Sequence, residues 1–387
     1  MAVALIHGRV LLGRTLASDM AVLIEGGRIA AVVPDTDPRC RTAQVHELQG
    51  QLLLPGFIDV QVNGGGGVLF NDAPNVASIR AIGAAHRRFG TTGFLPTLIS
   101  ADLAVVARAI AAARSALEAR VPGVLGLHIE GPFLNVARKG VHDAAKLREL
   151  GPGEIALLTS LGHGRTVLTL APEMTTPRII RELSAAGVLV SAGHTNATCA
   201  QIRCALDHGL RGFTHLFNAM SQLTGREPGA VGAALADPNS WCGIIVDGVH
   251  VDPLVLRIAL RCKSHDRFML VTDAMPSVGT QDDSFKLQGR RIAVRGHACV
   301  DEDGRLAGSN IDMASCVRNA VDLLGLPLVE AVRMASEAPA AFLGLGDLGR
   351  IARGYRANLV LADDRLNVLE TWIDGEPSRA PHSPSGA

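Results

Sequence analysis

The sequence has no excess of charge of either sign and no apolar run long enough to span a membrane. Lys plus Arg and Asp plus Glu each number 37 among 387 residues, so no net field would draw the chain to nucleic acid or to an anionic membrane. The first apolar stretch is interrupted by His7, Gly8, Arg9 and Gly13, which leaves no signal-peptide core. We therefore predict a soluble protein that binds neither nucleic acid nor a membrane, and that holds any anion locally.

Cysteine is scattered rather than patterned. The seven cysteines are an odd number without a Cys-x-x-Cys pair, namely Cys40, Cys199, Cys204, Cys242, Cys262, Cys299 and Cys316. Neither a disulfide framework nor a thiolate zinc site is indicated. A reducing compartment fits this composition, and we predict a cytoplasmic protein.

Apolar residues, in contrast, make up 48% of the chain, which is enough for one large core with a smaller unit attached. Residues 1–53 alternate short apolar runs with glycine turns, and about forty residues at the other end repeat this texture. Such a texture is typical of β-hairpins. We predict a small β-sandwich domain built from both ends, residues 1–53 and 346–387.

Between these ends, strand-like apolar runs alternate with helical stretches rich in Ala, Leu and Arg. This alternation predicts a parallel sheet buried on both faces, and eight runs are the number that a (β/α)8 TIM barrel requires. We predict an α/β fold with this barrel over residues 54–345, with an open doubly wound sheet as the alternative. Residues 276–310 indicate a β-hairpin insertion around Asp303 and Gly304. The eight runs are 56–63, 91–98, 124–131, 166–173, 188–195, 212–219, 242–250 and 268–275.

Polar residues stand at the ends of these predicted strands, where barrel enzymes carry their chemistry. They are Gln61, Asn63, His128, Glu130, His194, His215, Asp247, His250 and Asp273. One carboxylate and two imidazoles from separate strands can meet above a barrel, and three such ligands with an open fourth position are the pattern of a catalytic metal site. Glu130, His194 and His215 match this pattern. The alternative is that each is a hydrogen-bonded structural residue.

Asp273 ends the eighth predicted strand, in LVTDAM. As a catalytic residue it would accept a proton from an activated water and pass it to the leaving group, first as general base and then as general acid. The alternative is a carboxylate that only caps the following turn.

Several motifs resemble those of one family. They occur in the order LPGFIDVQVNGGGG, GLHIEGPFLN, KGVHD, SAGHTNAT, THLFNAM, GREPG, DGVHVDP, VTDAM and GRLAGS, over residues 50–315. This order is similar to that of the N-acetylglucosamine-6-phosphate deacetylases of the amidohydrolase superfamily. GLHIEGPF together with THLFNAM is a specific signal, whereas GFIDV is shared across the superfamily.

The resemblance implies roles for individual residues. Glu130, His194 and His215 would bind the metal. Asp273 would be the acid/base, and His142 would contact the acyl oxygen, whose developing charge an imidazole donor stabilises.

The resemblance also implies a set of substrate contacts. Arg226 suits a phosphate because its planar fork of donors is always charged, although a solvated loop arginine is the alternative. In the family the residue matching His250 reaches the phosphate of the neighbouring subunit, which implies a homodimer. The expected substrate-binding residues are Gln61, Asn63, Val141, His142, Asn218, Ala219, Arg226, Asp247, His250, Leu306, Ala307 and Gly308.

Gln61 and Asn63 bear on the number of metal ions. Many superfamily members have a His-x-His pair here, which binds a second metal with help from a carboxylated lysine on the fourth strand. Neutral amides are weak ligands by comparison, and the fourth strand of this chain ends in Ala-Pro-Glu. We therefore expect one divalent ion per chain, Zn²⁺ first, with Fe²⁺, Co²⁺ or Mn²⁺ as alternatives. The amides would hydrogen-bond around the site or to the backbone of the glycine loop.

The expected reaction is hydrolysis of the N-acetyl amide of N-acetylglucosamine 6-phosphate to glucosamine 6-phosphate and acetate. Acceptance of N-acetylgalactosamine 6-phosphate stays open. Two hypotheses compete with this reaction: an amidohydrolase acting on an unphosphorylated or cyclic amide, and a non-catalytic module that kept the barrel for binding. A convergent ligand set beside an acid/base argues against the module.

Overall fold

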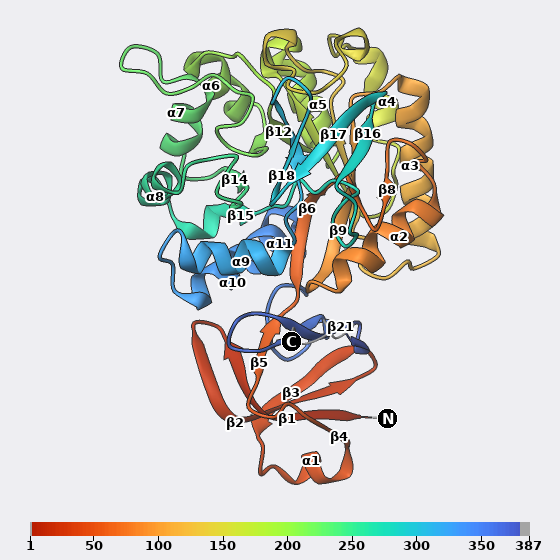
Figure 1. The fold of residues 1–387 in the computed structure, drawn as a ribbon, viewed down its shortest axis with the longest axis vertical. Coiled ribbons are helices and arrows are strands. Elements are labelled where there is room, and N and C mark those ends of the chain that lie inside the picture. Colours follow the sequence, from red (N-terminus) through yellow and green to blue (C-terminus); the bar gives the residue numbers. More distant parts are fainter. Residues whose placement is uncertain (1, 380–387) are drawn as a thin grey trace.

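The computed structural model describes residues 2–379; residue 1 and residues 380–387, at the two ends of the predicted small domain, lie outside them. The chain folds into a barrel and a smaller sheet beside it (Figure 1). No helix of the described residues combines the length and the apolar character needed to cross a membrane.

The smaller sheet takes its strands from both ends of the described chain. Its strands are β1 (Val3–Leu12), β2 (Thr15–Glu25), β3 (Arg28–Pro34), β4 (Gln44–Glu47), β5 (Leu52–Pro55), β20 (Leu359–Ala362), β21 (Val368–Ile373) and β22 (Glu376–Arg379). They are ordered β22-β21-β20-β5-β1-β2-β3, with β4 also paired to β1. Leu53, Leu359 and Trp372 are buried in one cluster on this sheet, so residues from both ends share one core.

The barrel is a parallel sheet of eight strands in chain order. Its strands are β6 (Phe57–Val62), β9 (Thr91–Ile99), β10 (Gly126–Glu130), β11 (Arg165–Leu170), β12 (Leu189–Ala192), β13 (Leu210–Phe213), β14 (Trp241–Ile244) and β15 (Phe268–Leu270). The barrel is closed by a parallel bridge between Val62, on the first strand, and Ala274, just beyond the last. The barrel prediction is therefore confirmed, and the open-sheet alternative is wrong.

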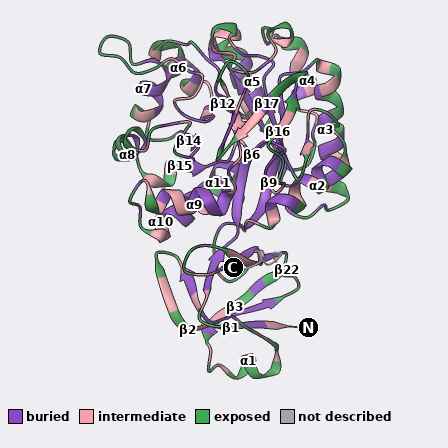
Figure 2. Ribbon diagram, in the orientation of Figure 1, coloured by how far each residue is buried: buried purple, intermediate pink, exposed green. Residues whose placement is uncertain are grey.

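The barrel strands are largely buried, whereas the helices around them have both buried and exposed residues (Figure 2). Every residue of β6 and β9 is buried, because a parallel sheet is covered on both faces. The helices of the described chain are α1 (Pro38–Thr42), α2 (Val76–Arg87), α3 (Leu103–Glu118), α4 (Ile155–Leu158), α5 (Pro177–Ala185), α6 (Cys199–Asp207), α7 (Gly229–Ala236), α8 (Pro253–Cys262), α9 (Met313–Asp322), α10 (Leu328–Ala335) and α11 (Glu337–Leu343).

The insertion after the last barrel strand is larger than one hairpin. Four antiparallel strands form it: β16 (Ser284–Leu287), β17 (Arg290–Arg295), β18 (Ala298–Val300) and β19 (Leu306–Ser309). The predicted hairpin is the β18–β19 pair, and its turn is closed by the Asp301 N–H bonded to the Arg305 carbonyl at 2.9 Å. A short pair, β7 (Gly64–Gly65) and β8 (Val68–Leu69), forms from the glycine loop after β6. Met275, Leu287 and Ala307 belong to one buried cluster, which joins the insertion to the end of the barrel.

Candidate active site

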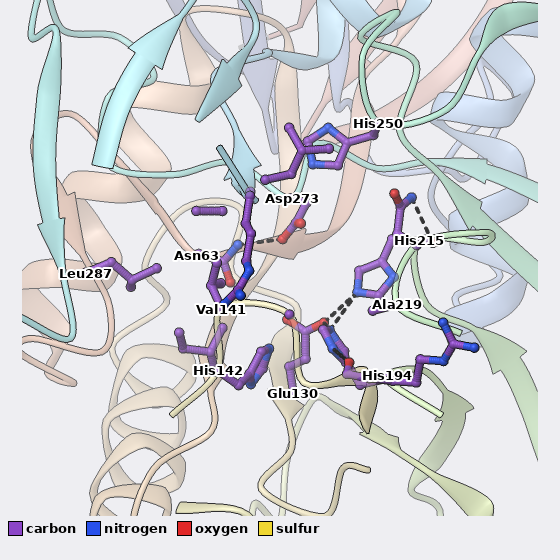
Figure 3. A pocket seen from close by; sticks show the side chains of 18 of the residues that line it. Asn63, Glu130, Val141, His142, His194, His215, Ala219, His250, Asp273 and Leu287 are labelled. Atoms are coloured by element: carbon purple, nitrogen blue, oxygen red, sulfur yellow. Dashed lines mark hydrogen bonds and ion pairs between the residues drawn. The ribbon is translucent and has the colours of Figure 1, made fainter. Parts of the chain in front are cut away.

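Three ligating side chains meet at the carboxyl ends of separate barrel strands. Glu130 ends β10, whereas His194 and His215 lie just beyond β12 and β13, with φ of 48° and 34°. His215 Nε2 lies 3.0 Å from both Glu130 Oε1 and His194 Nε2, and His194 Nε2 lies 3.3 Å from the same carboxylate oxygen. Figure 3 shows these three side chains turned toward one another, with Asp273 and Asn63 across from them.

This arrangement fits a divalent cation. Ligands at about 2.0–2.1 Å from a tetrahedral ion lie roughly 3.3 Å from one another, which is close to the observed separations. His194 Nδ1 lies 2.9 Å from the Arg138 carbonyl, to which it can donate. That bond leaves the lone pair on Nε2, the atom that faces Glu130 and His215.

The contacts among these side chains shift the pKa values of Glu130 and His215. Burial alone would raise the pKa of Glu130, but its contacts with His194 and His215 hold that pKa well below the usual value. Burial opposes protonation of His215, yet the hydrogen bond and the charge of Glu130 raise its pKa. A carboxylate that stays ionised in a buried place is suited to holding a cation.

Asp273 lies at the same level of the barrel and is held by the two amides of β6. Asn63 Nδ2 donates to Asp273 Oδ1 at 2.6 Å, and Gln61 Nε2 donates to the same oxygen at 3.1 Å. Gln61 Nε2 also lies 3.3 Å from Glu130 Oε1. Burial, with the nearby charge of Glu130, raises the pKa of Asp273. The amides therefore hydrogen-bond to the acids of the site, which is one of the two uses that the sequence left open for them.

His142 lies beside the metal-site residues as a neutral imidazole. Its ring centroid is 4.4 Å from that of His194, and burial, with the charge of His194, lowers its pKa to about 3. Its Nδ1 lies 2.7 Å from Ser100 Oγ and 3.4 Å from the Ser100 backbone N–H. Because that N–H can only donate, Nδ1 is the acceptor and the ring proton is on Nε2.

Most of the predicted site residues line one cavity of about 540 Å³. Two arginines that the sequence did not suggest, Arg138 and Arg305, line it as well. The predicted residues on its wall are Asn63, Glu130, Val141, His142, His194, His215, Asn218, Ala219, His250, Asp273, Leu306, Ala307 and Gly308.

Three predicted residues lie off the cavity wall. Gln61 stands behind Asp273 and donates to it. Asp247 Oδ2 lies 2.6 Å from His250 Nδ1 and thereby orients that ring toward the cavity. Burial would raise the pKa of Asp247, but the hydrogen bond from His250 lowers it. Arg226 is exposed on the loop between β13 and α7.

Glu173, just beyond β11, supports the site from outside it. It accepts hydrogen bonds from Asn135 Nδ2 at 3.0 Å, Thr195 Oγ1 at 2.5 Å and the Asn196 N–H at 2.6 Å. It thus joins the loops that follow β10 and β12. The sequence could have suggested Glu173, because it stands at a predicted strand end, although nothing around it indicates which loops it contacts.

His128 belongs to a buried row of hydroxyl groups beneath Glu130. Its Nε2 lies 2.8 Å from Thr169 Oγ1 and its Nδ1 lies 3.1 Å from Thr97 Oγ1. Burial lowers its pKa to about 4, so the ring is neutral. It contacts hydroxyls of the neighbouring strands and is a structural residue of the barrel interior.

Comparison with known proteins agrees with this geometry. The model of the amidohydrolase family matches residues 52–381. The chain belongs to that family. Within it, an N-acetylgalactosamine-6-phosphate deacetylase of Shewanella sp. (strain ANA-3) is 42% identical, over 95% of this chain and 94% of the relative. An N-acetylglucosamine-6-phosphate deacetylase of Haemophilus influenzae is 38% identical, over 92% and 94%.

Solved structures of family members have the same fold. The N-acetylglucosamine-6-phosphate deacetylase of Pasteurella multocida superposes with a TM-score of 0.94 at 36% identity, covering 98% of this chain and all of the other. A mutant of the Mycobacterium smegmatis enzyme, solved in complex with N-acetyl-D-glucosamine-6-phosphate, superposes at 0.89 with 34% identity, covering 97% and 98%. The resemblance to the deacetylases of this family, drawn from the motifs, is confirmed.

Proposed function

We propose that the chain hydrolyses the N-acetyl amide of N-acetylglucosamine 6-phosphate to glucosamine 6-phosphate and acetate. The observation that carries this proposal is the meeting of Glu130, His194 and His215 with Asp273 in one cavity. In a family whose relatives are deacetylases of amino-sugar phosphates, that arrangement supports a hydrolase. It leaves no reason to expect the non-catalytic module.

Glu130, His194 and His215 would hold a single divalent cation, which we propose to be Zn²⁺. When bound, such an ion acts as a Lewis acid and lowers the pKa of water from about 15.7 to roughly 7. Gln61 and Asn63 donate hydrogen bonds instead of offering imidazole nitrogens, which supports one ion per chain.

Asp273 would move the proton. It takes a proton from the attacking water as the new bond from oxygen to the acetyl carbon forms, and gives it to the amide nitrogen as the carbon–nitrogen bond breaks. Both amides of β6 donate to Oδ1, so Oδ2 is the oxygen left for this transfer. The products are acetate, which carries the oxygen of the water, and the free amine, which carries its proton.

His142 would stabilise the charge that develops on the acyl oxygen. Its pKa, lowered to about 3, keeps it neutral at physiological pH, and its Nε2–H is free to donate because Nδ1 accepts from Ser100. A donor aimed at an oxygen that becomes negative stabilises the transition state more than the ground state.

We propose further that Arg226 and His250 bind the phosphate and that the chain acts as a homodimer. His250 lines the cavity, whereas Arg226 does not, and Arg138 and Arg305 add positive charge to the cavity wall that favours a phosphorylated substrate. Three apolar side chains near His250 are exposed: Val249 at 51%, Leu254 at 56% and Ile258 at 52%. A second copy covering this part of α8 and the loop before it would remove that apolar surface from water.

Three other properties are proposed from the cysteines and from the topology of the chain. The cysteines of the chain are all free, which supports a reducing compartment such as the cytoplasm. Strands from both ends share one sheet, which supports a separate small domain of residues 1–53 and 346–387. Residues 54–345 would then form the catalytic domain.

The test is an acetate-release assay on the phosphorylated and plain N-acetylhexosamines, with and without a chelator, alongside elemental analysis. We expect turnover of N-acetylglucosamine 6-phosphate that the chelator abolishes, and nearly none by Asp273→Asn, which should keep its metal. Equal turnover of plain N-acetylglucosamine, or an active Asp273→Asn variant, would refute the proposal.

A second candidate substrate is N-acetylgalactosamine 6-phosphate, because a relative at 42% identity carries that name. The two sugars differ only in the orientation of one hydroxyl, so the ratio of their kcat/KM values decides between them. A ratio above one for the galactose epimer would favour this second candidate.

A further inference from the structure

Asp59 is a buried acid that the proposed reaction does not use. It lies on β6, two residues before Gln61, and its exposure to solvent is 0%. Burial raises its pKa to about 7 despite hydrogen bonds that act in the opposite direction. Burying a carboxyl group costs free energy unless both of its oxygens are hydrogen-bonded. The hydrogen-bond partners of Asp59 therefore indicate its role.

Those contacts all lie where the barrel closes. Asp59 Oδ2 accepts from the Thr272 hydroxyl at 2.5 Å, and Oδ1 accepts from the backbone N–H groups of Gln61 at 3.1 Å and Thr272 at 3.4 Å. The first and last strands form no regular ladder with each other, and the barrel is closed by an isolated bridge between Val62 and Ala274, beyond the end of β15. The Asp59 carboxylate therefore bonds backbone groups that a regular strand pair would have satisfied.

The residue that follows Thr272 is Asp273, and its backbone is unusual. Its φ is 51°, a left-handed conformation that few residues other than glycine, asparagine and aspartate adopt. Its N–H donates to the Gln61 carbonyl at 3.0 Å, and its carbonyl accepts from the Ser309 N–H at 3.0 Å. The Ser309 hydroxyl donates to the Thr272 carbonyl at 2.5 Å.

We propose that Asp59 is a positioning residue for Asp273, which it holds in its left-handed conformation by bonding the hydroxyl and N–H of Thr272 across the closure of the barrel. The inference rests on the proposed role of Asp273 as the acid/base. Neither Asp59 nor Thr272 lines the cavity, and their side-chain hydrogen bonds within the described residues go to β6, to each other and to the segment after β15. Their loss should thus change how Asp273 is aimed without changing what the site binds.

The test replaces the Thr272 hydroxyl by a methyl group of the same size, as Thr272→Val. Because a misplacement of about 1 Å can lower a rate roughly a hundredfold, we expect kcat to fall about 10- to 100-fold. KM should stay within about twofold, and metal content by elemental analysis should be unchanged. Thr272→Ser, which keeps the hydroxyl, should restore kcat to within about threefold of the wild type.

Two comparisons separate positioning from a general loss of stability. Thr91→Val removes a buried hydroxyl of β9 that has no hydrogen-bond partner among the described residues, and it should leave kcat unchanged. Asp59→Asn, which keeps one acceptor oxygen and can reverse the bond to Thr272, should lower kcat less than Asp59→Ala does. A folded Thr272→Val variant with kcat within twofold of the wild type would overturn the inference, as would a loss confined to KM or to metal content.

The same assays separate this inference from the proposed function. If Asp273→Asn keeps its turnover, the role of Asp273 fails and the positioning inference fails with it. If Asp273→Asn is inactive while Thr272→Val turns over normally, only the positioning inference fails.

Discussion

At the scale of single residues, each catalytic group of the site is held by partners that are distant in the sequence. Asp273 is bonded to Asn63 and Gln61, more than two hundred positions away, and His142 is bonded to Ser100. Such bonds fix the rotamers of side chains that must act on a bound substrate, so the geometry is present before any ligand arrives.

The buried Asp59 predicts a pH dependence of stability. Its pKa is about 7 in the folded chain and near 3.9 in an unfolded one, so the folded state holds the proton more tightly. The contribution of Asp59 to stability is therefore complete below about pH 4 and is lost as the pH rises toward 7. Asp59→Asn lacks this change, and its Tm relative to that of the wild type should rise between pH 4 and 7 and then level off.

The measurement is thermal unfolding followed by circular dichroism at several pH values. Asp282→Asn, a substitution of an exposed aspartate, supplies the baseline for removing one carboxyl group. Wild-type and Asp59→Asn curves that run parallel from pH 4 to 8 would contradict the prediction.

At the scale of elements, the loops after β10, β11 and β12 depend on one another. Glu173 bonds Asn135 on one side and Thr195 and Asn196 on the other, and the Asn135 N–H donates to the His194 carbonyl at 3.0 Å. Removing the carboxylate would leave both loops less constrained, and His194 with them.

Glu173→Ala should therefore weaken metal binding. Losing a residue that orients a metal ligand without itself binding the metal lowers metal affinity about 10- to 100-fold. We expect a loss in that range. Titration of the metal-free protein with Zn²⁺ and with Co²⁺ measures it. Glu118→Ala, at an exposed helix end, is the matched control; an affinity equal in the two variants would show that Glu173 does not act through His194.

The elements themselves were predictable to different degrees. The barrel strands could be predicted because β6, β9 and β10 are buried along their whole length and are correspondingly rich in apolar residues, a pattern that a doubly covered sheet requires. Strands β16 and β17 carry Lys286, Arg290 and Arg291 and are only partly buried, so no apolar run marked them. A partly exposed antiparallel sheet has a weaker sequence pattern than a buried one.

The residues of the candidate site were likewise predictable to different degrees. Glu130, His194 and His215 could be proposed because a ligand at a strand end has a position that the sequence reveals. Ser100 and Glu173 also stand at strand ends, but their role depends on hydrogen bonds to residues of other loops. No spacing in the sequence indicates such a contact.

At the scale of the whole molecule, His250 can serve either the cavity of its own chain or that of a neighbouring subunit. Its ring lines the cavity of its own chain and is bonded to Asp247, whereas the family resemblance assigns it to the phosphate of the neighbouring subunit. The exposed apolar side chains beside it, Val249 and Leu254, would put it near a dimer interface. Light scattering should find a dimer, and a monomer at assay concentrations would exclude the crossed arrangement.

A mixed dimer separates the two assignments. One subunit carries His250→Ala and the other Asp273→Asn, each with its own affinity tag so that the mixed species can be purified. If His250 serves the neighbouring site, one of the two cavities regains both an intact Asp273 and an intact His250. The mixed dimer should then recover about half of the wild-type activity at a substrate concentration below KM, well above either parent dimer. If His250 serves its own site, both cavities remain defective and no recovery occurs.

The control for this experiment is a mixed dimer of Asp273→Asn with Glu130→Gln. Asp273 and Glu130 are both bonded to the same Gln61 amide, so they belong to one cavity and one chain. Each cavity of this mixed dimer therefore lacks one of the two, whichever way the dimer is built, and no activity should return. Recovery in the control would mean that the subunits exchange more than His250, and the crossed assignment could not then be drawn from the first mixture.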